Sequence, residues 1–165
     1  MKKIFTLLVS ITIFSCSGEI NKSKISSNSS TSLKETKYVF QATYSQDFSM
    51  GDQTLVVIFQ SLLKNLQEGK LDNISNYFTE DVVWSLPDGG RLEGRENVIK
   101  FLIDFWSSSI VENYNSAVHF AVKSNQGDQW VLVWDSQSVN GELVSYQEAV
   151  QFEGDKIVFL NTFIK

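Results

Sequence analysis

The sequence predicts an α+β domain in which helices come first and consecutive antiparallel strands follow. Three observations lead to this prediction. Apolar residues after Asp52 recur at helical spacing, the stretch from Tyr77 to Trp106 changes from a strand period to a helix period at one marked turn, and the last third of the chain contains two strand-like runs around Asn140-Gly141. Helices followed by runs of strands are typical of the α+β class.

The first helix is expected to begin at Asp52, whose side chain can cap the free N–H groups of the first turn. Gly69 suits the left-handed position that follows a last helical turn. A short second helix is expected to end before Val82, and a third follows Gly94, which makes about three helices. The apolar residues that mark the first helix are Leu55, Ile58, Phe59, Leu62 and Leu66, and those that mark the second are Leu71, Ile74 and Phe78.

The stretch between Tyr77 and Trp106 reads as a strand, a turn and an amphipathic helix. Val82, Trp84 and Leu86 alternate with other residues at the two-residue period of a strand that has one buried face. The tetrapeptide at 87–90, Pro-Asp-Gly-Gly, favours a reversal of the chain. A polar loop is expected at 107–116 and a strand at 117–123. The apolar positions of the helix are Val98, Phe101, Leu102, Phe105 and Trp106.

A hairpin with a computable register is expected around Asn140-Gly141, because a two-residue turn of this composition favours the type I′ conformation. Counting outward from the turn pairs Asp135 with Tyr146, and directly opposed residues share a face of the sheet. A last strand is expected over 157–163. The count places Val131, Val133, Asp135, Tyr146, Glu148 and Val150 on one face and Trp130, Leu132 and Trp134 on the other.

The N-terminus reads as an export signal over 1–15, with Lys2 and Lys3 before a short apolar run. Residues 13–16, Ile-Phe-Ser-Cys, resemble the lipobox of bacterial lipoproteins, which implies that Cys16 is acylated and that the protein is anchored in the bacterial cell envelope, on the periplasmic or outer-membrane side. The alternative is a buried or free thiol in an ordinary signal sequence. We expect a flexible, polar tether at 16–37 and an extended arm at 38–51, where aromatic residues return.

Composition limits the classes of partner. With 42% hydrophobic and 13% aromatic residues in 165, the chain can bury one sizeable core, which we place at 52–165. The formal net charge of −5 disfavours nucleic acid and anionic membrane surfaces, so the lipid anchor is the only membrane contact expected. A single histidine and a single cysteine make no zinc cluster, and we predict neither a metal nor a cofactor.

Two segments carry a resemblance to a known family. These are LDNISNYFTEDVVWSLPDGGRLEGRENVIKFL and EAVQFEGDKIVFLNTFI. Over 52–165 the chain resembles the SnoaL-like branch of the nuclear transport factor 2-like superfamily. The resemblance implies a cone, in which a curved antiparallel sheet wraps around the helices and leaves an apolar pocket. Many members are homodimers through the outer sheet face, and the superfamily includes both enzymes and binding proteins, so the fold selects no function.

The resemblance also argues against the ketosteroid isomerase mechanism. Ketosteroid isomerases of this superfamily place a general base just before the proline of the turn, where this chain has Leu86, and an oxyanion-hole tyrosine where it has Leu62. Neither leucine can exchange a proton or donate a hydrogen bond. The second oxyanion acid of those enzymes aligns with Glu148, which keeps a carboxyl group.

Two hypotheses of function follow. A binding module would hold a small hydrophobic or amphipathic molecule, whereas a cofactor-independent hydrolase, lyase or isomerase would use Asp135 and Glu148 as an acid and base pair. In the opposite arrangement these groups would face solvent and the tryptophan face would form the core, or would mark an interface. The sole histidine, His119, suits a structural role or a pocket role. The predicted ligand-binding residues are Tyr146, Glu148, Trp84, Phe59, Leu62 and Phe101.

Overall fold

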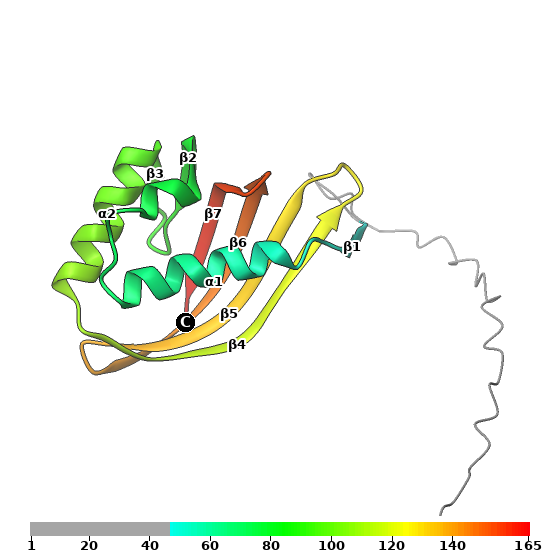
Figure 1. Cartoon of the computed structure of the whole chain (residues 1–165). Helices are drawn as coiled ribbons and strands as arrows, with labels where there is room; N and C mark the ends of the chain where they lie inside the picture. Colours follow the sequence, from blue (N-terminus) through cyan, green and yellow to red (C-terminus); the bar gives the residue numbers. More distant parts are fainter. Residues whose placement is uncertain (1–46) are drawn as a thin grey trace, which may run out of the picture. The chain divides into compact units, whose positions relative to one another are not determined.

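The computed structural model describes residues 47–165, which form a seven-stranded sheet with two α-helices on its inner side (Figure 1). The expected signal peptide, the tether, Cys16 and residues 38–46 of the arm lie outside the described residues. The order in the sheet is β1-β4-β5-β6-β7-β2-β3. The elements are β1 (Phe48–Met50), α1 (Thr54–Gln67), the 3-10 turn η1 (Ile74–Tyr77), β2 (Phe78–Ser85), β3 (Arg91–Glu93), α2 (Arg95–Ser108), β4 (Val111–Ser124), β5 (Gln129–Val139), β6 (Glu142–Glu153) and β7 (Lys156–Ile164).

Helix α1 lies across the curved strands β4 to β7, begins two residues after Asp52, and ends just before Gly69 (Figure 1). Asp52 Oδ1 accepts a hydrogen bond from the backbone N–H of Thr54 at 2.9 Å, and Gly69 has a φ of +67°, in the left-handed region. The face turned to the sheet is fully buried and supplies Leu55, Phe59, Leu62 and Leu66 to the core.

The prediction of about three helices is wrong, because the described residues contain only two α-helices. The expected second helix is reduced to the single 3-10 turn η1, and Phe78 already belongs to β2. Ile74 and Phe78 are both buried, as their spacing suggests. The residues between them include Ser75 and Asn76, whose side chains compete for backbone hydrogen bonds and weaken a helix.

The prediction of a wholly antiparallel sheet is also wrong. Strands β2 and β7 pair in parallel, with Trp84 opposite Leu160, whereas the other neighbouring strands are antiparallel. Helix α2 and strands β4 to β6 separate the two parallel strands along the chain. Local sequence patterns indicate the period of each strand but not which distant strand it pairs with. The parallel pairing of β2 with β7 therefore could not be predicted from the sequence.

Strand β4 replaces most of the loop that was expected at 107–116. It begins at Val111, and its pairing with β5 shifts register between Glu112 and Asn115 and again between Ser116 and Val118. Such bulges remove the two-residue alternation by which a strand is recognised. The short strand β3, which pairs with β2 after the Pro-Asp-Gly turn, was likewise not expected.

The hairpin of β5 and β6 confirms the predicted register at every pair. Val139 faces Glu142, and Asp135 faces Tyr146, without an intervening bulge. Asn140 and Gly141 have φ values of 52° and 87°, as a type I′ turn requires. The buried valines of the predicted inner face, Val131, Val133 and Val150, belong to the core.

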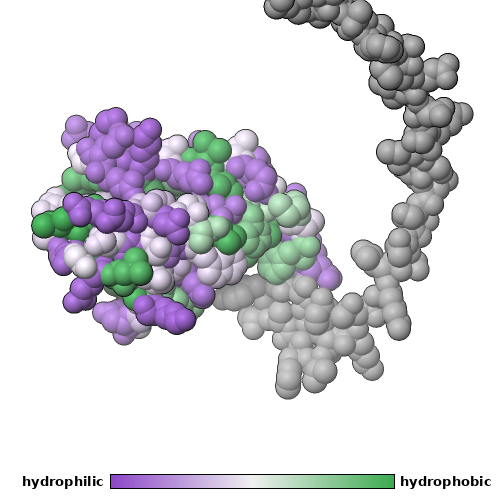
Figure 2. Space-filling model, turned by 90° about the horizontal axis from the view of Figure 1, so that it is seen from below, coloured by the Kyte–Doolittle hydropathy of each residue, from purple (hydrophilic) through white to green (hydrophobic). Residues whose placement is uncertain are grey.

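The outer face of the sheet carries the other set of side chains. Trp134 is 37% exposed and stacks on Phe120 with ring centroids 5.8 Å apart, and Phe163 is 56% exposed. The alternative in which the tryptophans form the core is therefore wrong. Figure 2 shows hydrophobic residues reaching the surface between hydrophilic ones on the face that it views. No helix between residues 47 and 165 has both the length and the apolar character needed to cross a membrane.

Candidate functional site

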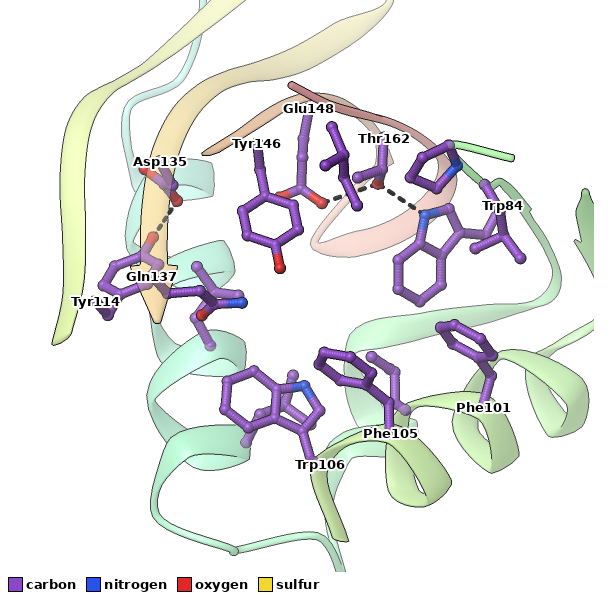
Figure 3. Close-up of a pocket in the computed structure, with 16 residues that line it drawn as sticks. Trp84, Phe101, Phe105, Trp106, Tyr114, Asp135, Gln137, Tyr146, Glu148 and Thr162 are labelled. Atoms are coloured by element: carbon purple, nitrogen blue, oxygen red, sulfur yellow. Dashed lines mark hydrogen bonds between the residues drawn. The ribbon is translucent and has the colours of Figure 1, made fainter. Parts of the chain in front are cut away.

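A cavity of about 160 Å³ lies between α2, the end of β2 and the inner face of β5 to β7 (Figure 3). Its wall combines a hydrophobic side, rich in aromatic rings, with a polar side formed by the sheet. The lining residues are Leu63, Leu66, Trp84, Leu86, Pro87, Phe101, Leu102, Phe105, Trp106, Tyr114, Asp135, Gln137, Tyr146, Glu148, Thr162 and Ile164.

The aromatic side of the cavity is built by one face of α2 and by Trp84 of β2. Phe101 and Phe105 project toward the cavity because residues four apart lie on the same side of a helix, and Trp106, the next residue, also lines it (Figure 3). Trp84 meets Phe101 edge to face, with ring centroids 5.4 Å apart and planes at 84°. Phe105 and Trp106 make a similar contact at 6.0 Å. Rings in these geometries hold one another in place and leave a rigid wall.

On the polar side, a chain of hydrogen bonds fixes one oxygen of Glu148. Thr162 of β7 stands directly opposite Glu148 of β6, so its hydroxyl reaches Glu148 Oε1 at 2.9 Å. The indole N–H of Trp84 donates to the oxygen of that hydroxyl at 2.8 Å (Figure 3). Among the residues described, Thr162 is the only hydrogen-bond partner of the Glu148 carboxyl group, so Oε2 is left for a ligand or water.

The ionisation of Glu148 is shifted toward neutral pH. The pKa of this carboxyl group is raised to about 7, chiefly because the group is buried and to a smaller extent because Asp135 is nearby. The hydrogen bond from Thr162 and the interaction with His119 act in the opposite direction but do not cancel the effect of burial. Glu148 therefore exchanges a proton near neutral pH.

Asp135 lies in a different environment, because both of its oxygens have protein donors. The hydroxyl of Tyr114 donates to Oδ2, and Nε2 of His119 lies 2.7 Å from Oδ1. The side-chain amide of Gln60 holds the other side of the imidazole, with its nitrogen 3.0 Å from Nδ1 of His119. Burial, and next the bond to Asp135, raise the pKa of Tyr114, so its hydroxyl stays protonated.

Two polar side chains face the cavity without a protein partner. Gln137 is only 8% exposed, and no hydrogen bond joins its amide group to another described residue. The same holds for the hydroxyl of Tyr146. Figure 3 shows both groups directed toward the interior of the cavity. No fully buried polar side-chain atom of residues 47–165 lacks a partner, so the amide group of Gln137 is open to the cavity, where water or a bound molecule can pair with it.

The structure brings most of the predicted site residues together. Asp135, Tyr146, Glu148, Trp84 and Phe101 line the cavity. The other two, Phe59 and Leu62, are buried in the core beside it and are not part of its wall. Phe59 instead packs on the ring of His119, with centroids 6.0 Å apart.

Sequence reasoning missed Tyr114, Gln137 and Thr162. The hairpin count already passes through Gln137, which it pairs with Val144 on the same face as Asp135, so the signal for this residue was present. Tyr114 was assigned to a loop, and the bulges that turn it toward Asp135 have no sequence signature that we recognised. Within residues 47–165, no three His, Cys, Asp or Glu side chains are arranged to hold a metal ion.

A family model described as the SnoaL-like domain matches residues 59–160, more than half of the chain. Among curated proteins, none gives a significant match.

Solved structures with the same fold include an NTF2-like (nuclear transport factor 2-like) protein of unknown function from Cytophaga hutchinsonii, with 15% identity, a TM-score of 0.53 and coverage of 70% of this chain and 93% of that one. A steroid delta-isomerase from Pseudomonas aeruginosa has 14% identity, a TM-score of 0.55 and coverage of 72% and 84%. A de novo designed protein with a curved β-sheet has 21% identity, a TM-score of 0.55 and coverage of 70% and 88%. At these identities the likeness shows the fold alone.

Proposed function

The chain belongs to the SnoaL-like domain family, and we propose that it binds a small hydrophobic or amphipathic molecule in the cavity between α2 and the sheet. The observation that carries this proposal is an aromatic wall that faces polar groups with free hydrogen-bonding positions. Among the described residues, Gln137 and Tyr146 have no protein partner for their polar groups and Glu148 has one, and ligand sites are typically apolar hollows with a few convergent polar groups.

The volume of the cavity limits the size of the ligand. A dry protein cavity of roughly 150 Å³ accommodates benzene. The cavity described above, at about 160 Å³, therefore suits a single substituted ring or a compact aliphatic group. A larger ligand would have to leave part of its surface outside, past Phe101 and Ile164, which are themselves partly exposed.

A direct test compares two variants that add the same bulk at different places. Leu86→Trp enlarges a side chain in the cavity wall, and Leu143→Trp does so at a site that is 76% exposed. We expect a molecule that co-purifies in native mass spectrometry to be lost from the Leu86 variant and kept by the Leu143 variant. Equal retention by both variants would mean that the molecule binds elsewhere.

An enzymatic role is the second candidate, and the raised pKa of Glu148 favours it. The steroid delta-isomerase among the similar structures gives a precedent for proton transfer on this fold. Leu86 stands where the resemblance places the isomerase base, so a cofactor-independent hydrolase, lyase or isomerase would depend on Glu148, with Asp135 as the second carboxyl group. If Glu148→Gln keeps the ligand and its turnover, this role is excluded.

We further propose that Cys16 is acylated and anchors the domain in the bacterial envelope. The support comes from the lipobox-like residues at 13–16 and the export signal before them. Detergent phase separation should place the chain in the detergent phase and the Cys16→Ser variant in the aqueous phase. A mature N-terminus with unmodified Cys16 would disprove the anchor.

A homodimer through the outer sheet face is the remaining proposal about partners. Val118, Trp134 and Phe163 give that face exposed hydrophobic area, which often marks an interface. Sedimentation at dilute concentration should show a dimer that Trp134→Glu dissociates. A monomer under the same conditions would refute this proposal.

A further inference from the structure

We propose that the cavity selects a small hydrophobic molecule that carries a positively charged amine or quaternary ammonium group. This inference rests on the proposed function and names the chemical class of its ligand. The first observation is the charge of the wall, because both Asp135 and Glu148 line the cavity and no lysine, arginine or histidine of the described residues does. A cation would be the missing counter-charge of this site.

The basic residues of the domain do not supply that counter-charge. In the described part of the chain, the ion pairs of lysine and arginine join surface groups such as Lys100 with Asp104 and Arg95 with Glu80. Between residues 47 and 165, the only basic group in contact with either cavity carboxyl group is the imidazole of His119, which contacts Asp135. That contact serves Asp135, and among residues 47–165 no basic side chain forms an ion pair with Glu148, whose second oxygen is left for a ligand.

The aromatic wall has the chemistry that recognises ammonium groups. A cation over the face of a tryptophan, tyrosine or phenylalanine ring is attracted by the ring quadrupole, and aromatic cages bind quaternary ammonium ligands in this way. Trp84 and Phe101 meet at 84°, so together they form a corner rather than a flat wall. Glu148 and Tyr146 stand across the cavity from the rings of α2 (Figure 3). A cation held between these two sides contacts rings and a carboxyl group at once.

Gln137 provides an independent indication that a ligand occupies this space. It is more than nine-tenths buried, it has no protein partner among residues 47–165, and its amide group is directed into the cavity (Figure 3). The amide oxygen can accept a hydrogen bond from an ammonium N–H or a ligand hydroxyl. Anionic ligands are disfavoured, because their charge would lie beside two carboxyl groups in a poorly solvated space.

Because Glu148 would lie beside the bound ammonium group, the affinity for such a ligand should depend on pH. Asp135, His119, Tyr114 and Tyr146 are the titratable groups that face Glu148 from the strands packed around it. With a pKa of about 7 for Glu148, the ionised fraction of its carboxyl group increases about tenfold between pH 6 and pH 8.5. The affinity for a permanent cation should increase by the same factor, whereas the affinity for a neutral molecule should not.

The test uses the full chain and two probes of the same shape. Benzyltrimethylammonium carries a permanent charge, and neopentylbenzene is its uncharged carbon isostere. Binding is followed by the fluorescence of the tryptophans and by ligand-observed NMR at pH 6 and pH 8.5. At pH 8.5 we expect the cation to bind at least about tenfold more tightly than neopentylbenzene, because the aromatic rings and the carboxylate both attract an ammonium group. We expect Glu148→Gln to lose the pH dependence, and Glu142→Gln, an exposed control on the same strand, to keep it.

The outcomes separate this inference from the proposal on which it rests. If neopentylbenzene binds as tightly as the cation, the charge preference is refuted and the binding function stands. If the cation binds with the same affinity at both pH values, Glu148 does not recognise it and the inference fails as well. If neither probe binds at millimolar concentration, both the inference and a cavity suited to this size of ligand are refuted. The comparison of the two probes in the unmodified protein tests the preference for a cation even if the Glu148 variant folds poorly.

Discussion

The replacement Glu148→Gln should make the protein more stable at alkaline pH, because it removes a carboxyl group that is costly to ionise where it stands. Glutamine has nearly the same shape and keeps an oxygen that can accept the hydrogen bond from Thr162. The ionised carboxylate of the native protein has only that one donor among the described residues and faces a largely hydrophobic cavity. The gain in stability should therefore depend on pH.

The magnitude follows from the pKa of Glu148 in the two states. Folding raises it from 4.5 to about 7, so between these values the folded state binds more protons than the unfolded state, and stability is lost as the pH increases. At 1.36 kcal/mol for each pH unit, the full loss of folding stability is about 3 kcal/mol. About 2.5 kcal/mol of this loss occurs between pH 5 and pH 8. The Glu148→Gln variant should not show this loss of stability.

Urea denaturation followed by tryptophan fluorescence at several pH values between 5 and 8 measures the difference. The free energy of unfolding of Glu148→Gln, relative to the unmodified protein, should increase by about 2.5 kcal/mol across this range. Glu142→Gln, which changes an exposed glutamate on the same strand, should leave the pH dependence unchanged. A constant difference between the Glu148 variant and the unmodified protein would refute the argument that burial controls this carboxyl group.

Three further predictions test the surrounding structure. Tyr114→Phe removes the hydroxyl that donates to the buried carboxyl group of Asp135 and should lower the free energy of unfolding by about 1.5–3 kcal/mol; a loss below about 0.5 kcal/mol in urea titrations would contradict the contact. Thr162→Val removes a hydrogen bond that lowers the pKa of Glu148, so that pKa should move above 7, as read from carbon NMR of a labelled carboxyl group; a lower value would show the sign to be wrong. Gly141→Ala puts a side chain at a φ of 87° with open space around it, so only backbone strain should act, and a loss of about 1–2 kcal/mol is expected. An unchanged melting temperature for this variant would argue against the type I′ turn.

The register of the site hairpin could be predicted because its determinants are local. Asn140-Gly141 fixes a turn of two residues, and the two-residue period of a strand then carries the pairing outward without accumulating error. This is why the sequence alone places Asp135, Tyr146 and Glu148 on one face. The helical period of α2 was equally local and identified Phe101 as part of its inner face.

The rest of the site depends on contacts between segments that are distant in the sequence. Trp84 reaches Thr162 only because β2 lies parallel to β7, a neighbour separated from it by most of the domain. Tyr114 and His119 converge on Asp135 only because β4 is bulged, which changes the side of the sheet to which its residues point. A bulged polar strand and a loop have similar compositions, so the sequence could not distinguish them.

The two carboxyl groups of the cavity differ in what they can do, although the sequence places them on one face as a pair. Both oxygens of Asp135 are engaged by Tyr114 and His119, so this group is held in place and a ligand would have to displace a protein donor to reach it. Glu148 keeps one oxygen free and has a pKa of about 7, so it can exchange a proton or meet a cation without breaking a protein contact. Any chemistry or selectivity of the cavity that depends on an acid should therefore act through Glu148, with Asp135 contributing its charge and the position of Tyr114.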